Sequence, residues 1–332
     1  MIIVTGGAGF IGSNVVHELN AHGIDDILVV DNLANAAKHL NLAGARFTDY
    51  LDKREFRRAF NENALGPRIE AILHQGACSN TLEDDGAYMM DNNFQYSKEL
   101  LAFAIRFGIP FVYASTAAVY GHSGPGHFTP TPENERPLNV YGFSKLVFDN
   151  YLRHQLTLGA IPITAVGLRY FNVYGQREQH KGRMASVIHH FTAQIGRNGR
   201  VRLFRGTGIF GDGEQRRDFV YVRDLARLNM FFAQLGPYAP ASGAARKIYQ
   251  GIANAGSGVS RTFNDVARAL MTVHGHAEIE YIPFPPDLVD RYQDFTEADL
   301  ASLRALGCNL EMTTLEDGIA ETFAAAPSLA RA

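Results

Sequence analysis

Short apolar runs alternate along the chain with longer stretches in which apolar residues recur at helical spacing. Runs that are apolar throughout are typical of strands buried on both faces of a parallel sheet. These runs are Met1–Thr5, Ile27–Asp31, Ile69–His74, Phe111–Ser115 and Ile163–Arg169. The helical pattern covers Ile11–His22, Lys53–Asn63, Tyr88–Phe107 and Val140–Gln155. Alternating strands and helices predict an α/β fold with a doubly wound parallel sheet, the Rossmann architecture.

The pattern loosens after Arg169, where Gly, Pro and aromatic residues become frequent. We therefore expect residues 1–169 to form a dinucleotide-binding domain and residues 170–332 to form mainly a smaller C-terminal substrate lobe over the ligand edge of the sheet. Segments near 219–254 are expected to return to the first domain, because the strand-like run Lys247–Ala253 suits the sheet. Ile279–Pro286 is predicted to be a strand that ends in a rigid loop.

Composition excludes several classes of protein. The chain of 332 residues has a net charge of −3 and no run of Lys or Arg, so nucleic acid is not an expected partner. Cys78 and Cys308 lie far apart without other ligands at metal-binding spacing, which predicts two free thiols and no metal site. The sequence has no 18-residue apolar stretch and no signal-peptide pattern. We expect a cytoplasmic protein without a membrane span.

A glycine-rich turn follows the first predicted strand. Gly6, Gly9 and Gly12 stand at GxxGxxG spacing in the run TGGAGFIGS. Glycines at these positions allow a tight turn, a close approach of backbone N–H groups to a pyrophosphate, and packing of helix on strand. The start of a helix adds unpaired N–H donors and a partial positive charge. The strand–turn–helix context predicts a dinucleotide site.

The end of the second strand bears on the choice between NAD and NADP. Asp31 follows Gly12 by 19 residues (31 − 12) and can accept hydrogen bonds from ribose hydroxyls, which favours NAD. Lys38 and Lys53 follow, and either ammonium could neutralise a 2′-phosphate, or could equally be a solvated surface charge. The residues alone leave both cofactors possible.

A catalytic constellation follows the fourth predicted strand. Thr116 directly follows that strand, and Tyr141 and Lys145 form a YxxxK pair in the run YGFSK. Residues four apart share a helix face, so Tyr141 and Lys145 are expected to point together into the cleft. We expect the Lys145 ammonium to lower the pKa of the phenol and make Tyr141 an acid or base near neutrality. Thr116 can hold a substrate hydroxyl or carbonyl.

Taken together, TGGAGFIGS, STAAVYG and YGFSK resemble the extended short-chain dehydrogenase/reductases that act on nucleotide sugars. Within them, HKGRMAS, RYQDFTEADL and IEYIPFP resemble the ADP-L-glycero-D-manno-heptose 6-epimerases, over nearly the whole chain. The resemblance implies epimerisation of ADP-heptose at C6, a step in making lipopolysaccharide inner-core precursors. It also implies bound NADP, with NAD possible, and a homo-oligomeric assembly, specifically a pentamer. Because C6 has no adjacent carbonyl, its C–H is not acidic; transient oxidation to a 6-keto sugar and hydride return to the other face would invert it.

The resemblance also implies roles for individual residues. Tyr141 and Lys181 would be the two acid/base groups, with Lys145 on the nicotinamide ribose. The implied cofactor residues are Gly6, Gly9, Phe10, Ile11, Gly12, Asp31, Asn32, Lys38, Lys53, Gln75, Gly76, Ala77, Cys78, Ser79, Asn92, Lys145, Val173 and Lys181. The implied substrate residues are Asn172, Arg183, His190, Phe204, Arg205, Gly206, Thr207, Arg217 and Tyr292. Thr116 replaces a Ser of the family pattern, and the glycine-rich stretch Gly206–Gly213 and Arg183 depart from it.

Plainer interpretations remain beside these. Arg217 could clamp a diphosphate or pair with Asp218, and His180 is expected to be a loop residue. Three aromatic residues could stack on adenine but are rather expected to fill the core: Tyr170, Phe171 and Tyr174.

Among other functions, a UDP-hexose 4-epimerase shares the fold. A sugar-nucleotide 4,6-dehydratase would need a carboxylic acid where Ala117 and Ala118 stand. A regulator without activity would be expected to lose Thr116, Tyr141 or Lys145.

Overall fold

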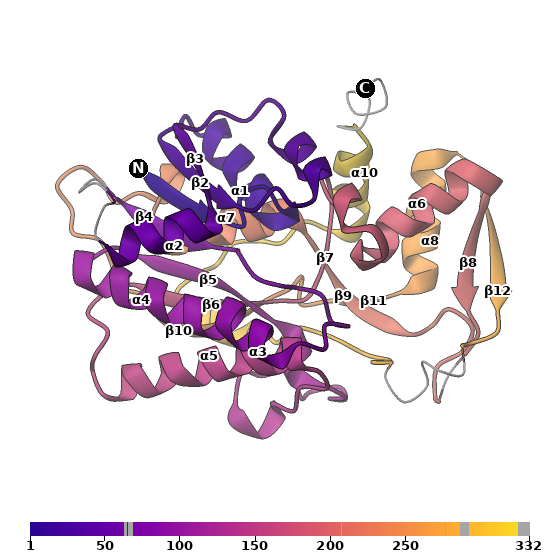
Figure 1. Ribbon diagram of the computed structural model, residues 1–332. Coiled ribbons are helices and arrows are strands. Elements are labelled where there is room, and N and C mark those ends of the chain that lie inside the picture. Colours follow the sequence, from indigo (N-terminus) through magenta and orange to yellow (C-terminus); the bar gives the residue numbers. More distant parts are fainter. Residues whose placement is uncertain (63–64, 66–68, 207, 276, 286–291, 325–332) are drawn as a thin grey trace.

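A seven-stranded parallel sheet organises the larger part of the fold (Figure 1). The computed structural model describes residues 1–62, 65, 69–206, 208–275, 277–285 and 292–324. The strand order is β10-β6-β5-β4-β1-β2-β3, and every neighbouring pair is parallel. The strands are β1 (Ile2–Thr5), β2 (Ile27–Asp31), β3 (Asp49–Asp52), β4 (Ala71–His74), β5 (Phe111–Thr116), β6 (Ala165–Tyr170) and β10 (Gln250–Ala255). The predicted doubly wound α/β fold is confirmed.

Helices cover both faces of this sheet because successive side chains of each strand point to opposite sides. Val4 of β1 packs in a core with α1 (Phe10–Ala21) and α7 (Val222–Ala233). Ile3, the preceding residue, packs on the other face with α2 (Lys53–Asn61), α4 (Tyr96–Phe107) and α5 (Val140–Thr157). The order of the strands reverses between β1 and β4: β2 and β3 follow on one side of β1, and β4 to β6 on the other. The crevice at the carboxyl ends of β1 and β4 is therefore the expected ligand edge.

The other half of the chain builds a smaller lobe beside the ligand edge (Figure 1). It contains a three-stranded sheet of order β11-β9-β7 and a parallel pair, β12 and β8. Ile188, Val201 and Phe219 lie in its core. Its elements are β7 (Asn172–Tyr174), α6 (Val187–Asn198), β8 (Arg200–Phe204), β9 (Arg216–Tyr221), β11 (Ser260–Thr262), α8 (Phe263–His274), β12 (Glu278–Ile282) and α10 (Leu315–Ala324). Helix α9 (Ala301–Ala305) instead packs beside β10, with Leu303 in the core of the main sheet.

The strand predicted over 247–253 does rejoin the main sheet, as β10 beside β6. The predicted helix over 88–107 is divided into α3 (Gly86–Met89), a wider π-helical turn, η2 (Met90–Gln95), and α4. Strand β3 was not predicted, because its sequence DYLD is short and polar; it forms at the sheet edge by pairing with β2. The segment predicted as a strand over 279–286 is β12, and Pro286 lies outside the described residues, as does Asn63 of the predicted second helix.

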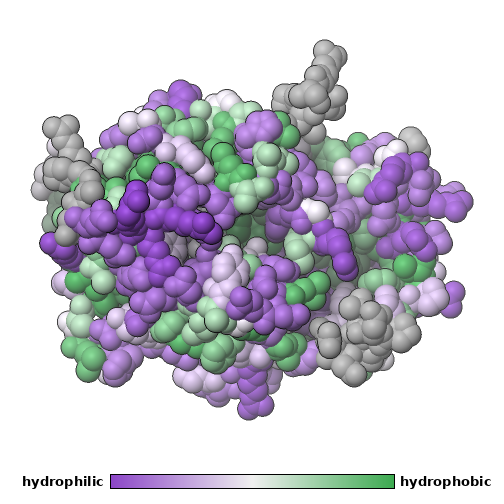
Figure 2. Space-filling model, viewed as in Figure 1, coloured by the Kyte–Doolittle hydropathy of each residue, from purple (hydrophilic) through white to green (hydrophobic). Residues whose placement is uncertain are grey.

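Hydrophilic side chains gather over α2 on the face shown in Figure 2, where Arg54 and Arg58 are exposed while Phe56 and Phe60 are buried against the sheet. The spacing of these two Phe residues is that of an amphipathic helix.

Among the helices that the structure describes, none is long and apolar enough to cross a membrane.

Candidate active site

A cavity of about 900 Å³ opens where the carboxyl ends of the sheet strands face the smaller lobe. Gly6, Gln75 and Thr116 line it from the ends of β1, β4 and β5. Asn172 and Tyr292 line it from the side of the lobe. This volume is at the upper end of the range for small-molecule and cofactor sites.

The glycine turn has the shape that a diphosphate requires. Gly6 has a φ of +66°, and a Cβ there would lie 2.7 Å from the backbone nitrogen of Gly76. A Cβ on Gly12 would collide with the carbonyl oxygen of Gly6. Gly9 begins α1, and among the described residues no side chain caps that helix. The first-turn N–H groups and the positive end of the helix dipole are therefore suited to an anionic group.

Asp31, at the end of β2, is already hydrogen-bonded on both carboxylate oxygens. Its Oδ2 accepts from the backbone N–H of Ala8 at 2.9 Å. Its Oδ1 accepts from the Nζ of Lys38 at 2.8 Å and from the backbone N–H of Asn32 at 2.6 Å. The Lys38 ammonium therefore offsets the negative charge of Asp31 at this end of the cavity. Nearby, Lys53 donates to the Oδ1 of Asn92 at 2.8 Å.

Helix α5 brings Tyr141 and Lys145 to the end of β5. Asn139 caps the helix by accepting from the N–H of Gly142 at 2.8 Å. Gly142 packs closely under the preceding loop, since a Cβ there would lie 2.9 Å from the carbonyl oxygen of Ala118. Tyr141, Lys145 and Thr116 all line the cavity, so the structure brings the predicted triad together.

Asp149, one helical turn after Lys145, anchors the same helix from below. Its carboxylate accepts from the hydroxyls of Tyr113 at 2.8 Å and Ser115 at 2.9 Å, both on β5. It also pairs with Arg169 on β6, at 2.8 Å. All of these side chains are buried, so α5 is held firmly against the two strands beneath the catalytic residues.

The pKa of Tyr141 differs in direction from the sequence-based expectation. Burial raises the pKa of the phenol, and a hydrogen bond with Thr116 opposes this only in part. The Lys145 ammonium donates to the carbonyl oxygen of Ala114 at 2.9 Å, and burial lowers the pKa of Lys145 to about 8. The expected lowering of the Tyr141 pKa by Lys145 is therefore wrong for this structure, because desolvation of the phenol is the largest influence on its pKa.

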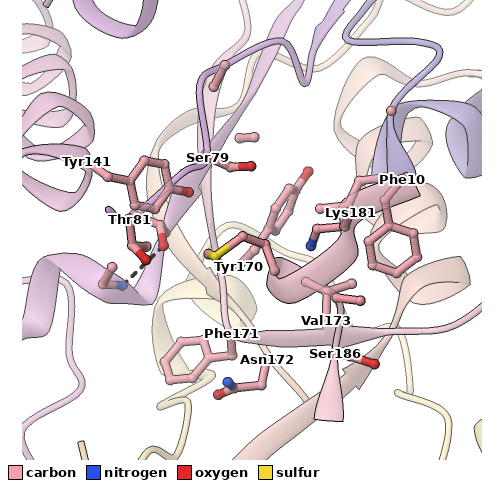
Figure 3. Close-up of a pocket in the computed structure, with 18 of the residues that line it drawn as sticks. Phe10, Ser79, Thr81, Tyr141, Tyr170, Phe171, Asn172, Val173, Lys181 and Ser186 are labelled. Carbon is pink, nitrogen blue, oxygen red and sulfur yellow. Dashed lines mark hydrogen bonds between the residues drawn. The ribbon is translucent and has the colours of Figure 1, made fainter. Parts of the chain in front are cut away.

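Lys181 enters the cavity from the opposite side. It lies in η5 (Gln179–Met184), a short 3₁₀ segment, and its Nζ lies 5.1 Å from the centre of the Phe10 ring. Burial lowers the pKa of Lys181, an effect that Glu178 partly opposes. Figure 3 shows Tyr141 and Lys181 on two sides of the cavity with Tyr170 between them, the hydroxyl and the ammonium both pointing into the space.

Arg217, on β9, is a buried cation at the far end of the cavity. Its guanidinium lies over the rings of Tyr292, at 4.9 Å, and Phe263, at 5.9 Å, and donates to the carbonyl oxygen of Arg216 at 2.9 Å. Asp218 turns away and accepts from backbone N–H groups of two other loops. The alternative that Arg217 serves to pair with Asp218 is therefore wrong, and the guanidinium faces the cavity.

Most of the predicted site residues line this single cavity. They are Gly6, Gly9, Phe10, Ile11, Gly12, Asp31, Asn32, Lys38, Lys53, Gln75, Gly76, Ala77, Ser79, Asn92, Thr116, Tyr141, Lys145, Asn172, Val173, Lys181, Phe204, Arg217 and Tyr292.

Five predicted residues lie outside the lining. Cys78 is next to it, with its backbone N–H and carbonyl both hydrogen-bonded to the Asn93 side chain. Arg183, Arg205 and Gly206 are exposed, and His190 lies on α6 with its ring against His189. Thr207 lies outside the described residues.

Several lining residues escaped the sequence-based prediction. Gln293 and Thr296 stand in the RYQDFTEADL motif, which was a usable signal. Tyr170 and Phe171 are buried, as expected for core residues, but also line the cavity. His180, expected to be a loop residue, is half-buried there as well.

Residues 2–244 match the NAD dependent epimerase/dehydratase family, and the chain belongs to that family. It is 54% identical over 320 residues to the ADP-L-glycero-D-manno-heptose-6-epimerase of Alkalilimnicola ehrlichii, a match that covers 96% of this chain and 95% of that protein.

Two solved structures extend the likeness to the whole fold. The ADP-L-glycero-D-manno-heptose-6-epimerase of Helicobacter pylori has a TM-score of 0.80 at 29% identity, covering 100% of this chain and 96% of that one. The UDP-glucose 4-epimerase of Thermotoga maritima has a TM-score of 0.75 at 29% identity, covering 99% of both chains. The resemblance inferred from the motifs is confirmed.

Proposed function

We propose that this chain epimerises ADP-heptose at C6, using NADP, through a 6-keto sugar. One observation carries the proposal: Tyr141 and Lys181 face each other across the cavity, next to the glycine turn. Inversion removes a hydride from one face of C6 and returns it to the other, and the oxygen on C6 loses and regains its proton in two different orientations; this arrangement offers one acid/base group on each side. The bound dinucleotide would supply hydride transfer, and the chain supplies the remaining chemistry.

The roles of the side chains follow from their positions. One of Tyr141 and Lys181 takes the proton from the C6 hydroxyl as the C–H bond gives up its hydride, and the other protonates the oxygen after the ketone has presented its second face. Burial raises the pKa of Tyr141 and lowers the pKa of Lys181, which favours the protonated phenol, a proton donor, and the neutral amine, a proton acceptor. Thr116 lies beside Tyr141 and can hold the reacting oxygen, and Arg217 can bind the diphosphate.

The adenosine end of the cavity favours NADP over NAD. A free Asp31 carboxylate would attract ribose hydroxyls and repel a 2′-phosphate. Here Lys38 pairs with Asp31, so the local negative charge is offset, and the ammonium beside the carboxylate could pair with a phosphate. Lys53, on the same side of the cavity, adds a second cation.

The Lys38→Met variant tests this preference. Loss of the ammonium should raise the dissociation constant for NADP⁺ by about tenfold or more, the effect of one charge-assisted hydrogen bond. The affinity for NAD⁺ should hold or improve, because Asp31 becomes free to accept from the ribose. Isothermal titration with both dinucleotides measures the two constants. Lys98→Met, which removes an ammonium stacked between the rings of Phe94 in η2 and Tyr151 in α5, is the matched control. Equal weakening for both dinucleotides would contradict the assignment.

Hydride transfer can be tested directly with substrate in D₂O. The C6 configuration of ADP-heptose should invert, and the product should carry no deuterium at C6, since a hydride held on a dinucleotide does not exchange with solvent whereas a proton on Tyr141 or Lys181 does. NMR gives the configuration and mass spectrometry the label. Substantial deuterium at C6 would favour proton abstraction instead of hydride transfer. If the protein inverts UDP-glucose at C4 and does not convert ADP-heptose, the hexose 4-epimerase alternative is favoured.

We also propose a cytoplasmic homo-oligomer, and a pentamer in particular. The motif resemblance supports this assembly, and the free thiols Cys78 and Cys308 suit a reducing compartment. Sedimentation velocity of the purified chain tests the assembly, and a monomer would contradict it.

A further inference from the structure

Two short 3₁₀ segments from distant parts of the sequence meet beside the cavity. The first, η1 (Ala36–Leu42), carries Lys38 and Asn41, and the second, η5, carries His180 and Lys181. Asn41 has an exposed fraction of 0% although it lies in a polar surface segment. A fully buried amide must be satisfied by hydrogen bonds, so its partners reveal what it holds together.

The Asn41 side chain joins the glycine turn to η5. Its Nδ2 donates to the carbonyl oxygen of Ala8 at 2.8 Å and lies 2.9 Å from the Nδ1 of His180. Its Oδ1 accepts from the Nε2 of Gln179 at 3.4 Å. The Asn41 carbonyl also contacts the His17 ring of α1, at 3.0 Å. The Asn41 side chain therefore connects η1 to the glycine turn and to η5.

These contacts decide the protonation state of His180. The Ala8 carbonyl can only accept, so the Asn41 atom that faces it must be the amide nitrogen. That nitrogen has a second hydrogen, which points to the Nδ1 of His180. Nδ1 must then be an unprotonated acceptor, and the ring is neutral with its proton on Nε2.

The groups around His180 agree with a neutral ring. Lys38 of η1 and Lys181 of η5 face it with positive charge, and Asp31 of β2 faces it with negative charge. Burial, followed by the two lysines, lowers the pKa of His180, and Asp31 and a backbone contact at Arg177 only partly oppose this. Protonation of Nδ1 would set two N–H groups against each other and break the contact with Asn41.

The position of Lys181 depends on the contact between Asn41 and His180. Its ammonium rests on the Phe10 ring, so the backbone of η5 largely determines where the charge lies. One end of η5 is anchored by Glu178, which accepts from the hydroxyl of Ser186 at 2.7 Å. The other anchor is His180, whose carbonyl also accepts from Asn35 of the η1 cap at 3.1 Å. Gly182, with a φ of +52°, breaks the segment directly after Lys181.

We propose that Asn41 is a positioning residue for the reaction: through the unprotonated Nδ1 of neutral His180, it fixes the Lys181 segment on the glycine turn. This inference rests on the proposed function in that Lys181 acts on substrate. His180 itself contributes an acceptor and not a transferred proton. The cofactor turn and the second acid/base group are thus joined by one amide.

Three variants separate this role from catalysis by His180. His180→Leu removes the acceptor, whereas His180→Asn places an amide oxygen near the former Nδ1 and cannot transfer a proton as imidazole does. We expect kcat to fall at least about tenfold in His180→Leu and Asn41→Ala, with KM for ADP-heptose changed far less, because a misplaced group costs rate. His180→Asn should recover most of the turnover. Asn61→Ala, an exposed Asn at the end of α2, is the control.

Each outcome bears on the proposal. If His180→Asn is as impaired as His180→Leu, His180 transfers a proton and the positioning role is overturned. If Asn41→Ala and His180→Leu retain wild-type kcat, the contact does not place Lys181. The His180 pair also serves if Asn41→Ala fails to fold, since both members keep Asn41 in place.

A second measurement needs no substrate and so remains valid even if the proposed function fails. ¹⁵N-histidine labelling gives the tautomer of each of the 12 histidines, and the signals lost in His180→Asn identify His180. We expect Nδ1 to be unprotonated and Nε2 to carry the proton at neutral pH. A protonated Nδ1 would overturn the proposal. Inactivity of the wild-type chain on ADP-heptose, with the expected tautomer present, would instead count against the proposed function.

Discussion

Tyr141→Phe is expected to lower the rate of C6 epimerisation by at least about a hundredfold, the lower range for loss of a general acid or base. The substitution removes one hydroxyl, which faces the cavity beside Thr116. The anchors of α5, namely Asp149 and the Asn139 cap, remain in place, so the fold and the dinucleotide site should be unchanged. Initial rates by NMR of the C6 epimers measure the effect.

The control for this variant lies on the same helix. Tyr151 is ten residues further along α5 (151 − 141), and its ring packs on Phe148 outside the cavity. Tyr151→Phe should keep the wild-type rate, and both variants should bind NADP⁺ within about twofold of wild type. Near-native turnover in Tyr141→Phe would remove Tyr141 from the mechanism. A large loss of NADP⁺ affinity would show instead that its hydroxyl serves the cofactor site.

Lys181→Met is expected nearly to abolish epimerisation while sparing part of the redox chemistry. If Tyr141 and Lys181 serve opposite faces of C6, inversion requires both, but a reaction on one face requires only one. An ADP-mannose analogue with an aldehyde at C6 separates these cases. The hydrate of one molecule gives up hydride and becomes the acid, and a second molecule takes that hydride and a proton and becomes the alcohol. This dismutation needs no inversion.

We therefore expect Lys181→Met to keep measurable dismutation, and Tyr141→Phe to keep a different share of it. Lys98→Met serves again as the control for loss of a lysine outside the cavity. If Lys181 only binds the diphosphate, KM should rise with little change in kcat. If it is a solvated loop residue, both assays should match wild type. Either result would leave Tyr141 as the only supported acid/base group.

The local parts of the site could be predicted from the residues themselves. The glycine turn and the pair Tyr141 and Lys145 depend on contacts within a few residues, and such geometry follows directly from strand–turn–helix and helical spacing. The main strands could be predicted for a related reason, since a strand buried on both faces must be apolar throughout. Strand β3 could not, because an edge strand takes its hydrogen bonds from a neighbour and needs no apolar run.

The amino-acid sequence alone thus determined the sheet, the glycine turn and the kinds of side chain in the site. The tertiary structure decided which charged groups meet and how strongly they are desolvated. Lys181 reaches Phe10 across 171 positions of sequence (181 − 10), and Lys38 pairs with Asp31. The pKa of Tyr141 rises because the folded chain removes water from the phenol, which spacing from Lys145 could not reveal. The physical reason is the range of the interactions: hydrogen bonds within a turn are set by neighbouring residues, whereas burial and ion pairing depend on the packing of the whole chain.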